Sequence, residues 1–432
     1  MAARPVFALA PQSSAHKNTI SLVPHLVSKN SHTSALFIDT MISSKSCCMP
    51  SNEACPRTTR TNLTFSRNWL IHVANETLVI AHNGRYTNRK GQVVDVSHSL
   101  DNSITNSVHY HSSHIFPTPH QDCRFSTQFY VAYGTPLELA AQLKDLGDEH
   151  QHIGILNSAS SKTPRKFLRG TISQEENIFR ATLLFPCLAQ FEAKPHHFYV
   201  INNKPKYEKS SSSCAIFSPK VPVIRCDTSC AELLDEPQEC SFVTICAPNA
   251  FALSENISIP EAARPGADKQ QRYEMTSLKK AMRDRLFRAL SIFNEHGCTD
   301  IVLCAFGCGV HGYQPEMVAT IFRELLHGEF KGRFRRVVFA INSERTPDFV
   351  AFKEVFAEAK GIWCYTLEKG KDLVKLARYL AGNPKNDDQH CKKQKKMSRW
   401  SSKRIMPNTL QENSLVSDKR SKNGDEVSPS IL

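Results

Sequence analysis

The middle of the chain alternates short apolar segments with longer amphipathic ones. The apolar segments have the length and composition of buried strands, and several stretches between them have helical periodicity. Strands alternating with helices predict a three-layer α/β fold with a partly parallel sheet. The expected strands are Phe129–Tyr133, His152–Leu156, His197–Ile201, Phe242–Cys246, Ile301–Phe306, Val337–Ile341 and Trp363–Thr366.

Helix signals lie between these strands. Thr135 to Glu138 reads as a capping box with Pro136 at the first helical position, and it predicts a helix to about Leu146. A stripe of apolar residues from Leu278 to Phe293, followed by Gly297, predicts a long helix. The expected helices are Ser66–Asn83 with Gly84 just past its end, Thr135–Leu146, Gln174–Phe191, Met275–His296 and Glu316–Leu326, and a serine-rich surface loop is expected at Asn202–Cys214.

The two ends of the chain lack this pattern. Residues 1–60 carry six Lys/Arg against two Asp/Glu and are rich in Ser, Thr and Asn, which predicts a disordered leader or, alternatively, an organelle transit peptide. Residues 381–432 form a basic tail, also expected to be disordered. Its cluster from Lys392 to Arg404 is either a nuclear-import or anionic-polymer patch or simply a solvated tail. The expected domain is therefore residues 61–380, beginning with a helical extension.

Composition restricts the function classes. The net charge of +13 over 432 residues is concentrated in the ends, since residues 391–432 add ten Lys/Arg against four acids. The core is thus not expected to read nucleic acid sequence. Fifteen cysteines without a CxxC pair indicate reduced thiols in the cytoplasm or nucleus and no metal site. No apolar run is long enough to cross a bilayer.

The segment from Asn157 to Arg180 carries the strongest indication of chemistry. It reads as a loop that leaves a strand and enters a helix beginning with Gln174, Glu175 and Glu176. A helix N-terminus favours anions, and a buried glutamate beside it can act as a general acid. The alternative is purely structural, because Ser173 and Glu176 have the spacing of a capping box in which Glu176 reaches back to the Ser173 amide.

Two loops could bind phosphate. The first carries the basic residues Lys162, Arg165, Lys166 and Arg169, which either neutralise phosphates or belong to an ordinary exposed loop. The second, residues 305–312 (AFGCGVHG), has glycines that allow backbone amides to approach a phosphate, although a tight turn without a ligand explains them equally well. His311 is either a base or a packing residue. Ser158, Ser160 and Ser161 fit no Ser-His-Asp triad.

A run of motifs resembles a known family. The segments NETLVIAHNGRY, TPLELA, GILNSAS, FLRGTISQEENIFRATLL, SPKVPVIR, CAPNA and AFGCGV occur in this order between roughly Phe65 and Ala357. Together they are similar to the microbial-type poly(ADP-ribose) glycohydrolase catalytic domain, which is macrodomain-like. The resemblance implies an α/β/α sandwich with a mixed central sheet that binds ADP-ribose across the carboxyl edge of that sheet.

The resemblance also implies roles for particular residues. Glu176 would protonate the departing ribose oxygen and Glu175 would hold a ribose hydroxyl, without a metal or a cofactor. The partner would be ADP-ribose or poly(ADP-ribose) on modified proteins, with no membrane involved. The residues expected to bind the ligand are Gln174, Asn157, Ser160, Arg165, Lys166, Phe167, Gly307, Cys308, Gly309, Val310 and His311.

The chain departs from the family pattern in the first loop. Arg165 and Lys166 stand where the family has three glycines, and Cβ atoms there should block the approach of backbone amides. His311 stands where the family often has Phe, and Ser158 replaces an aromatic residue. Two hypotheses follow: an enzyme, favoured by the retained glutamates, and a non-catalytic ADP-ribose-binding module. A gene model that has lost the glycine codons is a third, which sequencing the transcript across Ser160–Phe167 would settle.

Overall fold

The computed structural model describes most of the expected domain. The described residues are 66–119, 123–146, 148, 150–193, 195–207, 211–227, 231–255, 267–341, 346–357 and 364–367. The expected leader (1–60) and basic tail (381–432) lie outside the described residues, and so does the predicted strand start at Trp363.

An eight-stranded mixed sheet forms the centre of the domain, in the order β10-β4-β9-β8-β5-β7-β6-β3. The pairs from β10 to β7 are parallel, whereas β6 is antiparallel to both β7 and β3. The carboxyl ends of β5, β7 and β8 therefore meet at one edge of the sheet. The strands are β3 (Val108–Tyr110), β4 (Gln128–Tyr133), β5 (Ile153–Ser158), β6 (Ala215–Arg225), β7 (Leu233–Ile245), β8 (Asp300–Cys304), β9 (Arg336–Ile341) and β10 (Cys364–Leu367), with a separate hairpin of β1 (Arg85–Thr87) and β2 (Val93–Asp95).

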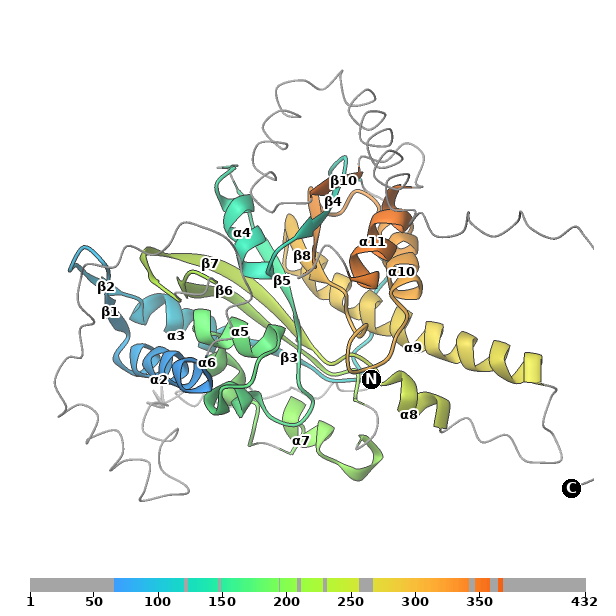
Figure 1. The fold of residues 1–432 in the computed structure, drawn as a ribbon, viewed down its shortest axis with the longest axis horizontal. Coiled ribbons are helices and arrows are strands. Elements are labelled where there is room, and N and C mark those ends of the chain that lie inside the picture. The colour runs from blue at the N-terminus through green and yellow to red at the C-terminus, as the bar shows by residue number, and fades with distance from the viewer. Residues whose placement is uncertain are drawn as a thin grey trace, which may run out of the picture.

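Helices cover both faces of the sheet (Figure 1). Alternate strand residues enter the two apolar layers, as when Ile155 packs into one and Leu156 into the other. The first layer contains residues of α2 (Arg67–Asn83), α3 (Ser97–Thr105), α4 (Pro136–Lys144), α5 (Gln174–Ala181), α6 (Leu184–Ala189) and α7 (Phe198–Asn202), and the second those of α8 (Ala250–Glu255), α9 (Ala267–Glu295), α10 (Pro315–His327) and α11 (Pro347–Ala357). The predicted three-layer fold, mixed sheet and N-terminal helical extension are confirmed.

Local signals set several element boundaries as the sequence predicts. Thr135 caps α4 in a complete capping box with Glu138. Ser66 caps the start of α2, and Gly84 closes that helix in the left-handed region at φ 65°. Gly297, at φ 67°, follows α9 in the same way. Each of these positions satisfies backbone groups that a helix end leaves unpaired.

Two predicted elements are wrong. The segment His197–Ile201, expected to be a strand, starts helix α7, and the buried side-chain Nδ2 of Asn202 donates to the Phe198 carbonyl oxygen at 2.9 Å. A short apolar run cannot be assigned by periodicity alone. The predicted helix Gln174–Phe191 divides into α5 and α6 because Thr182 is extended and pairs with Val223 of β6.

Strand β6 was not predicted. Its sequence contains Pro219 and Pro222, which usually mark a break in a strand. The structure accommodates them through a register shift after Ser218, where Lys220 adopts φ 46°. Strand β8 is shorter than predicted and ends at Cys304, which leaves Phe306 in a turn. The expected surface loop at Asn202–Cys214 has buried residues at both ends.

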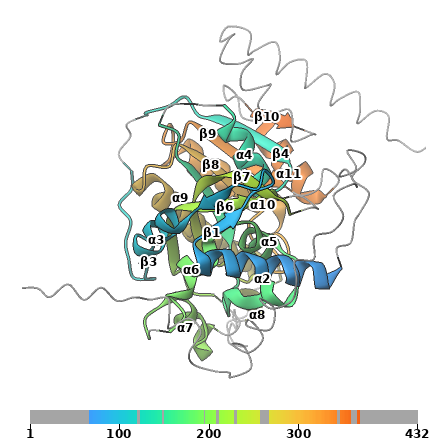
Figure 2. The same cartoon turned by 90° about the vertical axis from the view of Figure 1, so that its left-hand side faces the viewer.

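The N-terminal helix α2 holds the first phosphate-loop candidate in place. The loop forms a 3-10 helix, η2 (Pro164–Arg169), and Arg67 Nε donates to the Arg169 carbonyl oxygen at 2.8 Å. Gly170 ends η2 at φ 68°, and a Cβ atom there would lie 2.7 Å from the Arg67 carbonyl oxygen. Figure 2 shows α2 running across this side of the domain, so the extension supports one wall of the candidate site.

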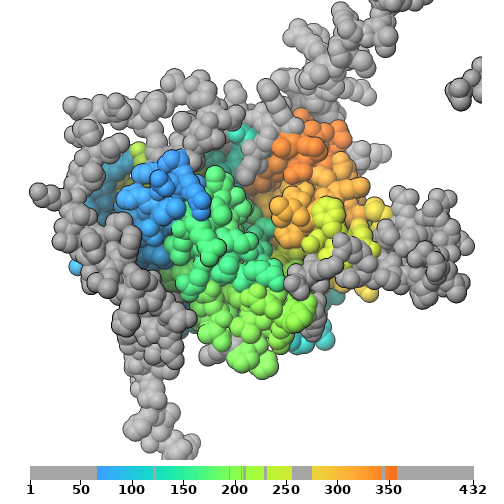
Figure 3. Space-filling model, turned by 60° about the horizontal axis from the view of Figure 1, so that its bottom comes forward, coloured from blue at the N-terminus to red at the C-terminus, as the bar shows by residue number. Residues whose placement is uncertain are grey.

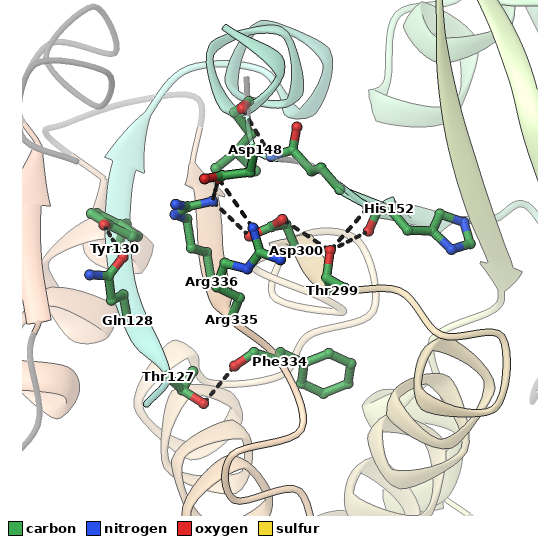
Figure 4. A network of polar contacts seen from close by, with 12 residues as sticks. Thr127, Gln128, Tyr130, Asp148, His152, Thr299, Asp300, Phe334, Arg335 and Arg336 are labelled. Carbon is green, nitrogen blue, oxygen red and sulfur yellow. Dashed lines mark hydrogen bonds and ion pairs between the residues drawn. The ribbon is translucent and has the colours of Figure 1, made fainter. Parts of the chain in front are cut away.

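A buried ionic network joins the amino ends of two strands (Figure 4). Arg336, at the start of β9, pairs with Asp148 at 2.5 Å and with Asp300, at the start of β8, at 3.2 Å. Asp300 is fully buried and also accepts from the Thr299 hydroxyl. Among the described residues, no helix is long and apolar enough to cross a membrane, and no cluster of His, Cys, Asp or Glu side chains is arranged to hold a metal ion.

Candidate functional site

The loops that follow β5 and β8 lie at the carboxyl edge of the sheet. Because β5 pairs in parallel with both β7 and β8, the segments that leave these three strands begin side by side. Helix α5 follows the first loop and α10 follows the second. Figure 3 shows one face of the molecule, on which surface from residues 150–200 lies between that of α2 and that of residues 300–350.

Glu175, in the first turn of α5, is held at both of its carboxyl oxygens. The Ser160 amide donates to Oε2 at 2.8 Å, and Asn157 Nδ2 donates to Oε1 at 3.5 Å. The side chain is 2% exposed. Burial raises the pKa of Glu175 to about 8, and the neighbouring Glu176 adds to the rise, although the Ser160 amide, Asn157 and Lys166 act in the opposite direction. Glu175 is therefore mostly protonated at neutral pH.

Glu176 lies beside Glu175 but has a different partner. The Ser173 hydroxyl donates to Glu176 Oε2. Ser173 is the residue before α5, yet its side chain accepts no bond from the helix amides, so the capping box predicted as the structural alternative is not formed. Glu176 is 5% exposed. Burying two adjacent carboxyl groups costs free energy of folding, and groups in such surroundings are concentrated at functional sites.

Gln174 fixes the start of α5 against the end of β5. Its Nε2 donates to the Leu156 carbonyl oxygen at 3.1 Å, and its Oε1 accepts from the Ser158 amide at 3.4 Å. The side chain thus bridges strand and helix and sets where the two glutamates lie. Its contacts are those of a positioning residue.

The loop that lacks glycines is wound into η2. Thr163 caps it by accepting from the Arg165 amide at 3.2 Å. The Arg165 guanidinium pairs with Glu192 at 2.6 Å and lies over the Phe185 ring, while Phe167 is fully buried against Phe179 and Phe185. The structure thus directs Arg165 and Phe167, both expected to bind the ligand, toward other protein groups.

The second loop keeps its glycines in a turn whose middle is open. Gly307 has φ 79°, and a Cβ atom there would lie 2.8 Å from Met282 Cε. A Cβ atom at Gly309 would meet nothing within 4 Å. In the described part of the chain, the amides of Gly309, Val310 and His311 donate to no protein acceptor. This is the backbone geometry that allows an anion to approach.

Several side chains of this second loop are accessible or neutral. Val310 is 89% exposed. Cys308 is half-buried, and burial raises the pKa of its thiol above the ordinary range. Burial, together with Arg285 and Lys166, lowers the pKa of His311. Because His311 and the Cys308 thiol are neutral, the positive charge near this loop comes from Arg285 and Lys166.

The structure brings the two loops within electrostatic range of one another. Lys166, from η2, lowers the pKa of Glu175, of His311 and of Cys246, the residue after β7. Lys166 replaces a family glycine, and its ammonium lies within range of the acid and of the glycine loop. Of the two residues that stand in for the glycines, Arg165 is paired with Glu192, whereas Lys166 acts electrostatically on Glu175 and His311.

Two residues at the site were not predicted from the sequence. Tyr199, on α7, is 2% exposed, and its hydroxyl has no hydrogen-bond partner among the residues that the structure describes. Burial, followed by Glu175, raises its pKa well above the ordinary value. Arg285, on α9, is 6% exposed and acts on His311 and Cys246. The sequence offered a signal for Arg285, since it falls on the same helical face as Leu278, seven residues earlier. Tyr199 gave none because its segment was read as a strand.

The arrangement can bind an anionic sugar and transfer a proton. A helix N-terminus, an open glycine turn and the cations Lys166 and Arg285 favour a phosphorylated ligand. The adjacent carboxyl groups of Glu175 and Glu176 can hold a hydroxyl group and protonate a leaving oxygen. Glu175 contacts Asn157 and Ser160 directly, and Gln174 contacts the neighbouring Ser158 amide.

Comparison with known proteins relates the chain to one family of enzymes. Residues 74–226 match the family model of the microbial-type PARG catalytic domain. The crystal structure of poly(ADP-ribose) glycohydrolase from Thermomonospora curvata is 28% identical, with a TM-score of 0.53, over 67% of this chain and 100% of that chain. The structure of the same enzyme bound to the inhibitor ADP-HPD is 29% identical, with a TM-score of 0.52, over 67% of this chain and 100% of that chain. No curated protein matches the chain by sequence. The resemblance stated from the sequence motifs is confirmed.

Proposed function

We propose that this chain, whose residues 74–226 match the microbial-type poly(ADP-ribose) glycohydrolase catalytic domain, hydrolyses the ribose–ribose O-glycosidic bonds of ADP-ribose polymers. It is accordingly a glycosidase. The observation that carries the proposal is the pair of buried carboxyl groups, Glu175 and Glu176, in the first turn of α5 at the carboxyl edge of the sheet.

In the proposed mechanism Glu176 is the general acid. It donates its proton to the ribose oxygen that departs as the glycosidic C–O bond breaks, through an oxocarbenium-like transition state. Water then adds to the anomeric carbon, and the proton it releases returns to the Glu176 carboxylate. The hydroxyl group of Ser173 orients Glu176 through its hydrogen bond to Oε2. No proton or electron is required from outside the site.

Glu175 has the role of holding the ribose. Its position is fixed by Ser160 and Asn157, and a neutral carboxyl group can both donate to and accept from a ribose hydroxyl. The amides of Gly309, Val310 and His311, with Gly307 and Cys308 shaping the turn, would line one side of the diphosphate. Lys166 would face it from η2.

A second candidate function is a non-catalytic ADP-ribose-binding module. The observation that favours it is the 3-10 helix η2, which stands where the family resemblance implies a glycine loop. In this helix Arg165 forms an ion pair with Glu192. Without close amides on that side, the ribose could be seated too far from Glu176, and a misplacement of about 1 Å costs on the order of 100-fold in rate.

One assay separates the two functions. The purified protein is incubated with a poly(ADP-ribosyl)ated acceptor, and released ADP-ribose is measured beside calorimetric binding of free ADP-ribose. We expect release by the unaltered protein, loss of at least 100-fold in Glu176→Gln, and similar ADP-ribose affinity in both. Glu239→Gln, an exposed carboxylate on β7, is the charge-matched control. Tight binding without release by the unaltered protein would establish the binding module instead.

For the compartment we propose cytoplasm or nucleus. The support is the absence of a CxxC framework among fifteen cysteines and the basic cluster from Lys392 to Arg404. We propose residues 61–380 as the working domain, with the leader and tail outside it. Fluorescence microscopy of cells that express the chain fused to a fluorescent protein, with and without residues 381–432, would show whether the cluster directs nuclear entry.

A further inference from the structure

Helix α9 carries an arginine within its buried face. Arg285 is 6% exposed, and its Nη2 donates to the Ser211 carbonyl oxygen at 3.1 Å. Its Nη1 has no hydrogen-bond partner among the described residues. A buried guanidinium normally has all of its donors satisfied, because an unpaired one loses its hydration without replacement.

Among the described residues, no carboxylate supplies the missing partner. The groups that act electrostatically on Arg285 are Cys246, Arg288, Cys214 and Tyr313, and no described carboxylate pairs with it. Burial lowers the pKa of Arg285 to about 10, which still leaves it charged at neutral pH. Within the part of the chain that the structure describes, this buried cation therefore has no counter-ion.

Arg285 lies beneath the glycine loop. Met282, one turn earlier on α9, lies under Gly307, and the Tyr313 hydroxyl donates to the Leu278 carbonyl oxygen at 3.4 Å. Ser211, which accepts from Arg285, donates through its own hydroxyl to the Ala247 carbonyl oxygen at 2.7 Å, in the segment that follows β7. Arg285 of α9 and Lys166 of η2 are both within electrostatic range of His311, and each lowers its pKa.

We propose that Arg285 is a diphosphate-binding residue of this site, and that with Lys166 it provides the positive donors that the missing glycine loop would otherwise supply as backbone amides. A guanidinium can bind a phosphate oxygen pair with two parallel hydrogen bonds, whereas an ammonium acts as a point charge. This inference rests on the proposed function for the identity of the ligand. The presence of an anion site beneath the glycine loop rests on Arg285 itself.

The same helix provides a matched control. Arg288, one turn further along α9, is 8% exposed, but its donors reach the carbonyl oxygens of His111, Ser112 and His114 and its guanidinium lies over Phe116. Arg288 is thus an arginine of equal burial whose hydrogen bonds are internal. Its replacement should affect folding and leave anion binding unchanged.

The test titrates the full chain with ADP-ribose, ADP, inorganic pyrophosphate and adenosine by calorimetry. We expect Arg285→Met to weaken binding of the three phosphorylated compounds by on the order of 100-fold, the loss typical of a charged hydrogen-bonded pair. Adenosine binding should be unchanged. Arg285→Lys should recover part of the affinity. Without ligand, Arg285→Met should melt no lower than the unaltered protein, whereas Arg288→Met should melt lower and retain its affinity.

The outcomes separate this inference from the proposed function. If ADP-ribose binds the unaltered protein and Arg285→Met equally well, the role of Arg285 is wrong while the proposed function stands. If only pyrophosphate and ADP bind, and both depend on Arg285, the anion site stands and the proposed function fails. A melting temperature lowered as in Arg288→Met, with adenosine affinity reduced alike, would make Arg285 structural and overturn the inference.

Discussion

Glu175 and Glu176 are neighbours in sequence, yet the protein surrounds them differently. Glu175 points back to the end of β5, where the Ser160 amide and Asn157 hold it, while Glu176 meets the Ser173 hydroxyl. Adjacent helical residues point about 100° apart, so one cannot replace the other. The helix thus offers two carboxyl groups for two tasks.

The raised pKa of Glu175 makes stability depend on pH. Its pKa in the folded state, about 8, lies above the ordinary value of 4.5, so the folded protein retains a proton that the unfolded chain releases. The stabilising contribution is complete below about pH 4.5 and disappears as the pH rises through about 8. We expect the unfolding free energy of Glu175→Gln, measured by urea denaturation, to fall less between about pH 5 and pH 8 than that of the unaltered protein. The difference can reach about 1.4 kcal/mol for each unit by which the folded and unfolded pKa values of Glu175 differ.

The control for this prediction is again Glu239→Gln, which changes the net charge equally at an exposed site. It should follow the pH profile of the unaltered protein. Parallel profiles for Glu175→Gln and the unaltered protein would mean that Glu175 titrates alike in the folded and unfolded states, contrary to the effect of its burial.

At the residue scale the sequence predicted positions better than orientations. Asn157, Ser160 and Glu175, all named from the sequence, are in contact because the loop after β5 brings α5 back to the end of that strand; their roles in binding stay predictions. The sequence could not show that Arg165 is taken up by Glu192, since this partner lies beyond α5 in the chain. Tyr199 and Arg285 reach the site from other elements, and only the tertiary fold reveals their proximity.

At the scale of elements, the contact between α2 and η2 is unusually close. Gly170 is in the left-handed region, and a Cβ atom there would lie 2.7 Å from both the Arg67 carbonyl oxygen and Arg67 Cγ. A side chain at this position would push α2 away from η2. Because η2 carries Phe167, which packs on α5, that displacement would also reach the helix that bears the glutamates.

We expect Gly170→Ala to destabilise the protein by roughly 1–3 kcal/mol more than Gly91→Ala, owing to overpacking. Gly91 has a similar φ of 75°, but a Cβ atom there meets nothing within 4 Å, so it isolates the backbone strain shared by both variants. Chemical denaturation measures the difference. Equal losses in the two variants would show that α2 moves aside without penalty.

Elements were predictable where a local signal was sufficient. The capping box of Thr135 and Glu138 fixed the start of α4 from four consecutive residues. The break after α5 depends on a distant partner, because the Leu183 amide donates to the Pro222 carbonyl oxygen of β6 at 2.9 Å. Thr182 itself gives no sign of that contact, but Pro186 cannot donate a helical hydrogen bond to the Thr182 carbonyl oxygen, and the prediction of a continuous helix overlooked this signal.

At the scale of the whole molecule, the ionic network of Asp148, Asp300 and Arg336 ties two strands to the loop before β5 (Figure 4). Burial raises the pKa of Asp300, although Arg336 and Arg335 oppose the rise. A fully buried carboxyl group with charged partners becomes strongly destabilising when one of those partners is removed.

Arg336→Met should lower the unfolding free energy by about 3–5 kcal/mol, because it leaves Asp300 buried without its cation. Arg335→Met, which removes a contact of 3.3 Å to Asp148 and a cation–π contact with Phe125 from a more exposed side chain, should cost less, about 1 kcal/mol. Urea denaturation compares them. The double variant Arg336→Met with Asp300→Val should recover part of the loss, and equal losses in the two single variants would contradict this account.

The layered fold class was predictable because alternating strands and helices have few arrangements. The order of strands in the sheet was not, since β4 pairs with β9 and β10, which lie far along the chain. The periodicity of the sequence indicates strands and helices, whereas the pairing of strands in the sheet depends on packing between distant segments. The family resemblance supplied the architecture that periodicity alone left open.

Strand direction has a practical consequence for anyone altering this protein. The network around Arg336 occupies the end of the sheet where β8 and β9 begin, and the paired glutamates occupy the end where β5 finishes. Replacements around Arg336 should change the melting temperature. Replacements around the paired glutamates should change the rate of hydrolysis or the heat of ligand binding. A library could therefore diversify the exit loops for new sugar ligands while leaving the anchoring end untouched.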